Sequence, residues 1–181
     1  MTTLCVYCSS ADSIDPSYLA LAEQVGTRLA QAGFDLVSGG GRVSMMGAVA
    51  RAARAGGAHS IGVIPEHLMA REVADVEADE LIVVATMRER KRIMDDRCDA
   101  VLALPGGIGT LEELFEMWTS RVLEMHDKPV VVLDPDGLFG PLWDWLEDLV
   151  KRGFVRQDAI DALVRVRTVD EAFAVFTSLS T

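Results

Sequence analysis

The stretch DAVLALPGGIGTLEELFEMW, residues 99–118, sets the fold class of this chain. Its first part is a continuous apolar run, which is typical of a strand buried on both faces of a parallel sheet. Pro105 and three glycines follow, and they lead into an amphipathic helix. The apolar side chains of that helix recur at i, i+3, i+4, i+7 and i+11: Leu111, Leu114, Phe115, Trp118 and Val122. The stretch therefore predicts a strand, a glycine turn and a helix, the repeating unit of an α/β fold.

The same alternation extends in both directions along the chain. Apolar runs predict seven strands, at residues 3–8, 34–41, 59–65, 79–86, 99–106, 128–134 and 163–168. Because such runs alternate with helical patterns, they predict a doubly wound, Rossmann-like sheet that is mostly parallel, with helices on both faces. In such folds ligands bind at the carboxyl ends of the strands.

Six helices are expected between these strands. Asp15 and Pro16 supply an N-cap and a first helical residue for a helix that ends at Gly33. The glycine turn at 105–109 precedes a long helix from Thr110 to about Met125. The other helices are expected at residues 46–57, 87–98, 141–154 and 169–179.

Composition and charge narrow the class of protein. The 181 residues, 50% of them hydrophobic, fit one nucleotide-binding domain over residues 1–181, with no linker or repeat. The net charge of −11 argues against affinity for nucleic acid or acidic membranes, so neither is an expected partner. The start MTTLCVYCSS lacks a signal-peptide pattern, and no run of apolar residues is long enough for a membrane span, so we expect a cytoplasmic protein.

The three cysteines do not form a disulfide framework. Cys5 and Cys8 lie on or just after the first expected strand, where three residues span roughly 10 Å. That separation exceeds the reach of a disulfide unless the chain turns sharply at Ser9. We expect Cys5, Cys8 and Cys98 to be buried or loop thiols without a redox function.

Two glycine clusters follow expected strands, SGGGRVSMMG at 38–47 and PGGIGT at 105–110. Neither matches the dinucleotide fingerprint, because Ser44 and Glu112 stand where its third glycine belongs. A Walker loop is also absent from the sequence. The second cluster opens a helix, whose free N–H groups and dipole favour a phosphate, so the pair of clusters predicts a mononucleotide-sized anion site. The alternative is that the glycines only form tight turns.

Charged residues near the second cluster allow two interpretations. Glu113 and Glu116 lie opposite the apolar stripe of their helix, as in a solvated acidic face. Arg90, however, shares the apolar side of its helix with Ile93 and Met94, and a semi-buried arginine needs an anionic partner. We therefore expect Arg90 to approach the glycine loop and Glu113; extension of its side chain into solvent is the alternative.

The run MRERKRIMDDRCDAVLALPGGIGTLEEL, residues 87–114, resembles the paired signature of the LONELY GUY family, phosphoribohydrolases often labelled lysine decarboxylases. The family pattern joins an Arg-Lys pair, here Arg90 and Lys91, to P-G-G-x-G-T-x-x-E, here residues 105–113. The runs SGGGRVSMMGAVA and VYCSS are also similar to family segments. Arg88, Ile108 and Ser38 depart from the pattern, which bears on base preference more than on reaction type.

The resemblance implies hydrolysis of the N-glycosidic bond of cytokinin riboside 5′-monophosphates or AMP, giving free base and ribose 5-phosphate. It also implies a homodimer and neither metal nor cofactor. It assigns catalysis to Arg90 and Glu113. It assigns substrate contacts to Gly40, Gly41, Glu72, Lys91, Gly106, Gly107, Ile108, Gly109, Thr110, Leu111, Glu112 and Thr119.

The residue types agree with that chemistry. Breaking a ribosyl C–N bond builds positive charge on the sugar, and the Glu113 carboxylate can stabilise it. Arg90 is always charged and is a poor general base, so it fixes Glu113, binds the phosphate or assists the leaving base. A pyridoxal-phosphate decarboxylase is disfavoured, because only Lys91, Lys128 and Lys151 could form a Schiff base in this short chain. A non-catalytic nucleotide carrier or sensor on the same fold stays open.

Overall fold

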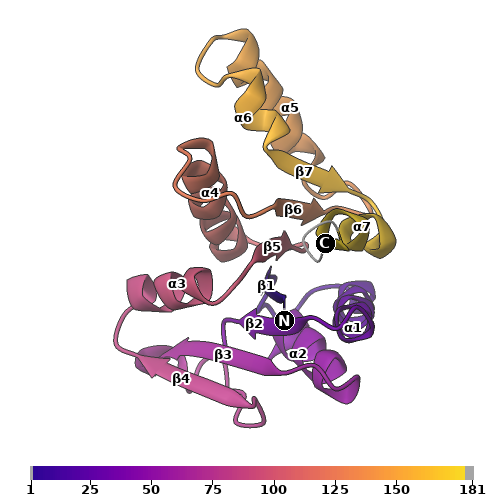
Figure 1. The fold of residues 1–181 in the computed structure, drawn as a ribbon, viewed down its shortest axis with the longest axis vertical. Coiled ribbons are helices and arrows are strands. Elements are labelled where there is room, and N and C mark those ends of the chain that lie inside the picture. Colours follow the sequence, from indigo (N-terminus) through magenta and orange to yellow (C-terminus); the bar gives the residue numbers. More distant parts are fainter. Residues whose placement is uncertain (1, 178–181) are drawn as a thin grey trace.

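A seven-stranded parallel sheet forms the centre of the structure (Figure 1). The computed structural model describes residues 2–177. The strand order is β4-β3-β2-β1-β5-β6-β7, and every strand pair is parallel. The strands are β1 (Thr3–Tyr7), β2 (Asp35–Ser38), β3 (Ser60–Pro65), β4 (Glu80–Val84), β5 (Ala100–Ala103), β6 (Val130–Leu133) and β7 (Leu163–Val166). The doubly wound, Rossmann-like prediction is confirmed.

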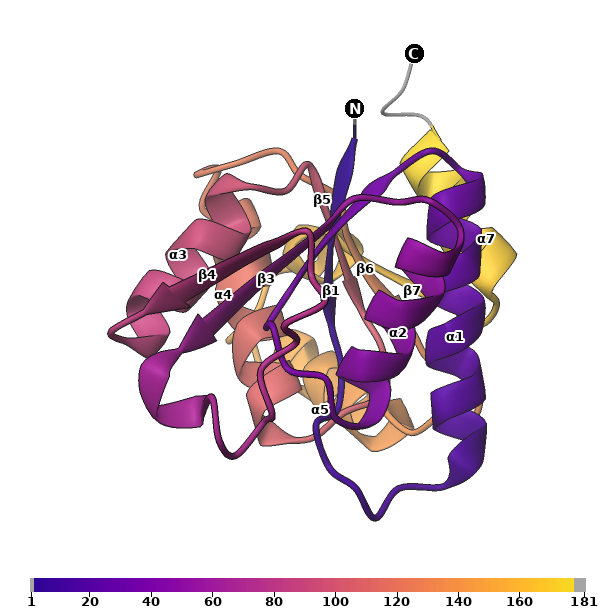
Figure 2. The same cartoon turned by 90° about the horizontal axis from the view of Figure 1, so that it is seen from below.

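Helices cover both faces of this sheet (Figures 1 and 2). One face carries α1 (Pro16–Gln31), α2 (Ser44–Ala55) and α7 (Val169–Thr177). The other carries α3 (Met87–Asp96), α4 (Ile108–Val122), α5 (Gly140–Lys151) and α6 (Gln157–Asp161). A short 3-10 turn, η1 (Glu66–Leu68), follows β3.

Each face of the sheet has its own hydrophobic core, because side chains alternate along every strand. On β1, Leu4 and Val6 pack with α1 and α2, whereas Cys5 and Tyr7 face α4. All four are at most 3% exposed. The three cysteines are free and buried, as the sequence predicted.

The predicted elements are present with shifted ends. Asp15 caps α1 by accepting a hydrogen bond from the Ser17 amide at 2.9 Å. The long helix α4 begins at Ile108 and ends at Val122, earlier at both ends than expected, and the chain turns away at Glu124 with φ +58°. The short η1 and α6 were not predicted. For the helix expected at 169–179, residues 178–179 lie outside the described residues.

The helix α4 packs on more than one neighbour. Besides the sheet it contacts α6, where Trp118 Nε1 donates to the Ala159 carbonyl at 2.6 Å. Met117 is buried in that packing, at 4% exposed. Leu123 and Met125, just beyond the helix, are 64% and 73% exposed.

The chain reverses its winding direction between β1 and β5. The connection after β1 runs to α1 on one face, whereas β5 leads to α4 on the other. Loops from adjacent strands therefore diverge at the carboxyl edge of the sheet, the usual place for a ligand in such folds. Within residues 2–177 no helix has the length and apolar character to cross a lipid bilayer.

Candidate active site

A cavity of about 280 Å³ opens at the point where the winding reverses. Its walls come from the loop after β1, the glycine loop after β2, the connection after β3, and helices α3 and α4. The residues that line it and carry charge are Glu72, Arg90, Glu112 and Glu113. Three carboxylates around one guanidinium favour a group that carries or develops positive charge.

The N-terminus of α4 is open toward this cavity. Gly107 is the N-cap and no side chain caps the helix, whereas α3 begins with a full capping box between Thr86 and Glu89. The first α4 backbone bond is the Leu111 amide to the Gly107 carbonyl, so the preceding helical amides lack intrahelical acceptors. Gly107, Ile108, Gly109 and Thr110 line the cavity at this end. These amides and the helix dipole can bind a phosphate.

Arg90 is fixed beneath the other glycine loop and is 4% exposed. Its Nε donates to the Val63 carbonyl at 3.1 Å, and its Nη2 donates to the Gly39 carbonyl at 2.7 Å. Nη2 also pairs with Glu72 Oε2 at 3.1 Å. A side chain at Gly39 would overlap the guanidinium, so the glycine is required for this close approach. The predicted burial of Arg90 on the apolar side of α3 is confirmed, and the solvent-exposed alternative is wrong.

Glu113 lies half-buried in the same cavity. Burial raises the pKa of its carboxyl from 4.5 to about 7, and the negative charges of Glu112 and Glu72 add to that rise while Arg90 and Lys91 oppose it. Among the described residues its carboxylate accepts no hydrogen bond, so it is available to a ligand. The solvated-face interpretation is therefore wrong for Glu113, while Glu116 is exposed.

One wall of the cavity is apolar. It is formed by Met46, Leu68, Met87, Met94 and Ile108. Ile108 is 89% exposed at the rim, whereas Met94 is 1% exposed at its inner end. A planar, largely apolar group such as a nucleobase can pack against such thioether and aliphatic side chains.

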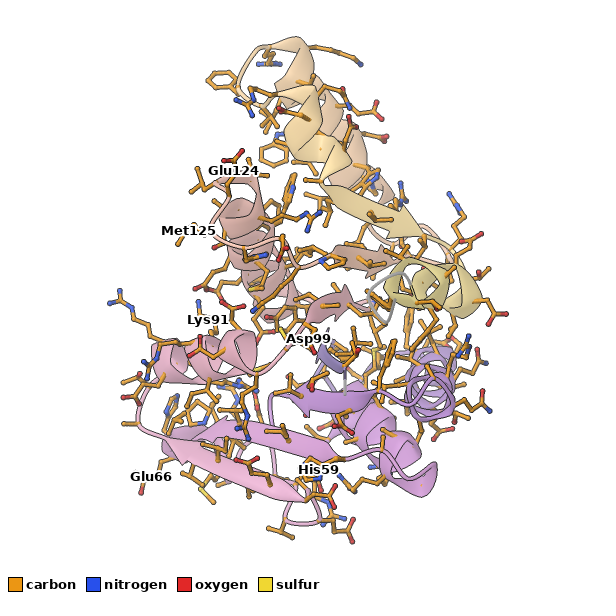
Figure 3. The ribbon with its side chains drawn as sticks, viewed as in Figure 1. His59, Glu66, Lys91, Asp99, Glu124 and Met125 are labelled. Carbon is orange, nitrogen blue, oxygen red and sulfur yellow. The ribbon has the colours of Figure 1, made fainter. Side chains whose placement is uncertain are left out.

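Lys91 occupies a second hollow beside the cavity. Its ammonium pairs with Glu112 and Glu116, and it lies between α3 and α4 (Figure 3). This hollow, about 370 Å³ in volume, shares Tyr7 and Glu113 with the cavity. The two spaces therefore meet at the Glu113 side chain.

The structure brings together part of the predicted site. The predicted residues in the cavity wall are Glu72, Arg90, Gly107, Ile108, Gly109, Thr110, Glu112 and Glu113. Lys91 lines the neighbouring hollow instead. Gly40, Gly41, Gly106, Leu111 and Thr119 line neither space.

The remaining residues that line the cavity were not predicted from the sequence. They are Val6, Tyr7, Cys8, Ser9, Ser10, Ala11, Gly39, Met46, Leu68, Met87 and Met94. Two features in the sequence could have indicated some of them. Ser9 and Ser10 come shortly after the end of β1, separated from it only by Cys8, and Gly39 is the first glycine of the cluster from which only Gly40 and Gly41 were predicted. Leu68 lies in the irregular connection after β3, where no pattern marks it.

Comparison with known proteins places this chain in a family. Residues 46–176 match a family model described as "possible lysine decarboxylase". The chain is 51% identical to the cytokinin riboside 5′-monophosphate phosphoribohydrolase of Mycobacterium marinum, over 94% of this chain and 90% of that protein. It is 52% identical to the Mycobacterium tuberculosis protein of the same name, with the same coverage. The Oryza sativa relative LOG is 44% identical over 93% of this chain and 69% of its own length.

Solved structures share the fold at lower identity. The molybdenum cofactor binding protein from Rippkaea orientalis superposes with a TM-score of 0.76 at 23% identity, covering 99% of this chain and 98% of that one. The Moco carrier protein of Chlamydomonas reinhardtii gives 0.74 at 20% identity, with coverage of 98% and 96%. These likenesses show the fold alone. The family model and the relatives above 40% identity show that the chain belongs to the LONELY GUY family, whose curated members are named cytokinin riboside 5′-monophosphate phosphoribohydrolases.

Proposed function

We propose that this chain hydrolyses the N-glycosidic bond of a nucleoside 5′-monophosphate, a cytokinin riboside 5′-monophosphate or AMP, to free base and ribose 5-phosphate. Relatives named for this reaction match at 51–52% identity along nearly their whole length. The observation that carries the proposal is the position of Glu113, a carboxylate without a hydrogen-bond partner among the described residues, beside the open N-terminus of α4.

The proposed substrate contacts follow from the cavity walls. The phosphate binds the free amides at residues 108–110, so the ribose lies over Glu113 one turn further along α4. The base packs on the apolar wall near Met87 and Met94. Lys91 is a proposed contact through the second hollow. The residues that line neither space are proposed to act only by shaping the backbone of the site: Gly40, Gly41, Gly106, Leu111 and Thr119.

The proposed reaction places positive charge on the sugar. As the bond from C1′ to the base nitrogen breaks, the ribose acquires oxocarbenium character, and a water oxygen bonds to C1′. One proton of that water ends on the released base. The Glu113 carboxylate stabilises the sugar cation, and Arg90 holds Glu72 and the glycine loop around it.

The proposal includes a homodimer in the cytoplasm, with residues 1–181 acting as one domain. Leu123 and Met125 are exposed just beyond the end of α4. Met125 (Figure 3) also lines the second hollow. A second copy packed on these side chains would cover apolar surface close to Glu113.

The deciding experiment incubates purified protein with AMP and with isopentenyladenosine monophosphate, without added metal or cofactor. Chromatography should show equal amounts of free base and ribose 5-phosphate. The nucleosides without phosphate should react poorly, because the amides of α4 would have no anion to bind. Nucleotide binding without turnover would instead favour a carrier or sensor, the role named for the structural neighbours that are Moco carriers.

A further inference from the structure

The connection between β3 and β4 is unusual for a parallel sheet. Such crossovers usually contain an α-helix, but residues 66–79 contain only the turn η1 and further turns. This crossover carries Glu72 and Leu68 to the cavity. Because this crossover contains no long helix that packs on the sheet, its position depends on individual hydrogen bonds and ion pairs.

The crossover is tied by its backbone to the glycine loop after β2. The Arg42 amide donates to the Val73 carbonyl at 2.9 Å, and the Asp75 amide donates to the Gly40 carbonyl at 2.8 Å. Gly41 and Ala74 form an isolated antiparallel bridge between these contacts. Val73, directly after Glu72, has φ +48°, a strained conformation for a β-branched residue. Such strain persists only where surrounding contacts fix it.

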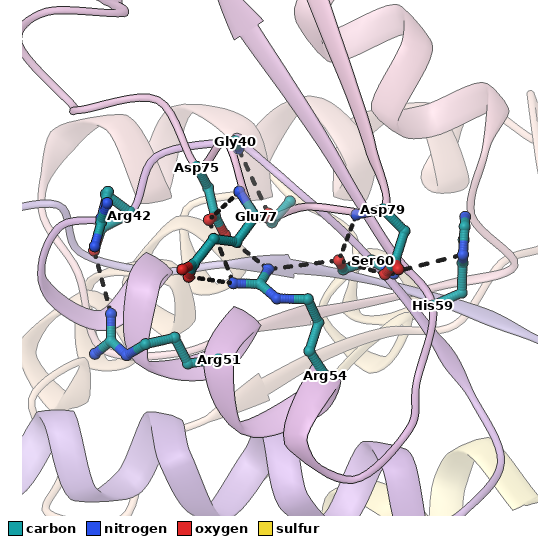
Figure 4. Close-up of polar contacts among 10 residues, drawn as sticks. Gly40, Arg42, Arg51, Arg54, His59, Ser60, Asp75, Glu77 and Asp79 are labelled. Atoms are coloured by element: carbon teal, nitrogen blue, oxygen red, sulfur yellow. Dashed lines mark hydrogen bonds and ion pairs between the residues drawn. The ribbon is translucent and has the colours of Figure 1, made fainter.

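A buried ion pair fixes the same crossover to α2 (Figure 4). Arg54 Nη1 lies 2.8 Å from Asp75 Oδ2, and Nη2 lies 3.3 Å from Oδ1. The Asp75 side chain is 5% exposed and the Arg54 side chain 16%. Arg54 also reaches Ser60 Oγ at 3.4 Å and Glu77 at 3.7 Å, so one guanidinium joins α2, β3 and the crossover.

Asp75 lies three residues after Glu72, the carboxylate that pairs with Arg90. Glu72 is tied to Arg90 through its side chain, while Asp75 is tied to Arg54 and to Gly40. A buried ion pair contributes little to stability relative to apolar residues of the same volume, so folding alone does not account for it. Its contacts connect α2 to the crossover that carries Glu72 to the cavity.

We propose that Arg54 and Asp75 are positioning residues: their ion pair holds the crossover so that Glu72 faces Arg90 in the active site. This inference rests on the proposed function for its effect on turnover, but the fixing of the crossover can be measured separately. Neither residue lines the cavity, so they act through Glu72.

The test uses the double variant Arg54→Met/Asp75→Leu, which leaves no unpaired buried charge and so should fold. Hydrogen–deuterium exchange should become faster in residues 66–79. With AMP, kcat should fall roughly 10- to 100-fold, because a small displacement of Glu72 in the active site is expected to slow the reaction by this much. Adding Glu72→Gln should cause no further loss, since the pair acts through that residue.

The matched control is Arg165→Met/Asp134→Leu. Asp134 is also a buried carboxylate paired with an arginine, but it follows β6 and lies outside the cavity wall. This control should leave kcat and exchange in 66–79 unchanged.

Two results overturn the inference. One is unchanged exchange in 66–79 in the Arg54/Asp75 variant. The other is a loss of turnover that adds fully to that of Glu72→Gln. If the wild-type protein releases no base, the proposed function fails, and the exchange measurement still decides whether the pair fixes the crossover.

Discussion

Arg90 Nη2 donates to Glu72 Oε2 at 3.1 Å, and this pair joins α3 to the crossover after β3. The sequence predicted that Arg90 approaches the second glycine cluster and Glu113. Among the described residues, Glu113 forms no hydrogen bond or ion pair with Arg90. The two side chains interact only by longer-range electrostatic attraction. Glu72 thus neutralises Arg90, and the Glu113 carboxylate is left free for a substrate.

Loss of the Glu113 charge should remove turnover while nucleotide binding persists. In Glu113→Gln we expect kcat to fall by ~10²-fold or more, because the amide cannot stabilise a sugar cation. Steady-state kinetics with AMP and calorimetric titration of nucleotide measure the two effects. The matched control is Glu147→Gln on the exposed surface of α5, which should behave as wild type. Near-wild-type kcat in Glu113→Gln would remove Glu113 from the mechanism.

The pH dependence of kcat should report Glu113. Its pKa is raised to about 7 by burial, and the proposed role needs the ionised form. We therefore expect kcat to increase roughly tenfold between pH 6 and pH 8, with the residual activity of Glu113→Gln independent of pH in this range. A kcat that decreases over the same range would show that the protonated carboxyl acts instead, as a general acid.

The free energy of unfolding should also depend on the raised pKa of Glu113, but it should decrease with pH where kcat increases. The folded-state pKa of Glu113 lies above its ordinary value of 4.5, so the unfolded chain releases this proton more readily. Ionisation of Glu113 thus destabilises the fold increasingly from about pH 4.5 to about pH 7. Glu113→Gln should raise the unfolding free energy by about 1 to 3 kcal/mol at pH 8. At pH 4 the variant and wild type should unfold at equal urea concentrations; an equal gain at both pH values would contradict the assignment.

The Arg90–Glu72 pair should show direct coupling in a double-mutant cycle. Arg90→Ala leaves Glu72 and the carbonyls of Gly39 and Val63 without their donor, and should cost about 2 to 4 kcal/mol of unfolding free energy. The double variant Arg90→Ala/Glu72→Ala should be more stable than the sum of single losses by about 1 kcal/mol or more. Urea denaturation gives all four values. Arg90→Ala combined with Glu113→Gln provides the comparison and should couple more weakly, since no contact joins those side chains.

Disruption of the apolar end of α4 should change the assembly. Leu123→Glu/Met125→Glu places charges on side chains that are 64% and 73% exposed, so the monomer should remain folded while a dimer dissociates. Light scattering at micromolar concentration measures the mass. Phe154→Glu, at a site 78% exposed after α5, is the control and should leave a dimer intact. A wild-type monomer would contradict the proposed homodimer.

Local patterns in the sequence determined the class of the fold and predicted part of the wall of the cavity. Seven apolar runs and the helical periodicities between them predicted the parallel sheet, because the hydrophobic patterns of strands and helices involve residues that are close together in the sequence. The glycine turn that opens α4 was predicted for the same reason, because it lies within a few consecutive residues. The role of Glu113 came from the family resemblance, since the local pattern alone also fitted a solvated acidic face. The burial of Arg90 was also readable, from its place among the apolar residues of α3.

Only the tertiary structure decided which partner each charge takes. Arg90 meets Glu72 and Gly39 because β2, β3 and α3 are brought together by sheet order, and no local pattern encodes that order. The crossover that carries Glu72 has no periodicity, and its position depends on contacts with Gly40 and Arg54 that are distant in sequence. Likewise, the sequence periodicity placed Glu113 opposite the apolar stripe of α4. In the structure the buried face of that helix includes Thr110 and Met117, three residues before and four residues after Glu113. The cavity walls from α3 and the loop after β1 enclose the carboxyl of Glu113, and burial raises its pKa. Burial and ion pairing are properties of the packed chain, since they arise between segments that the sequence keeps apart.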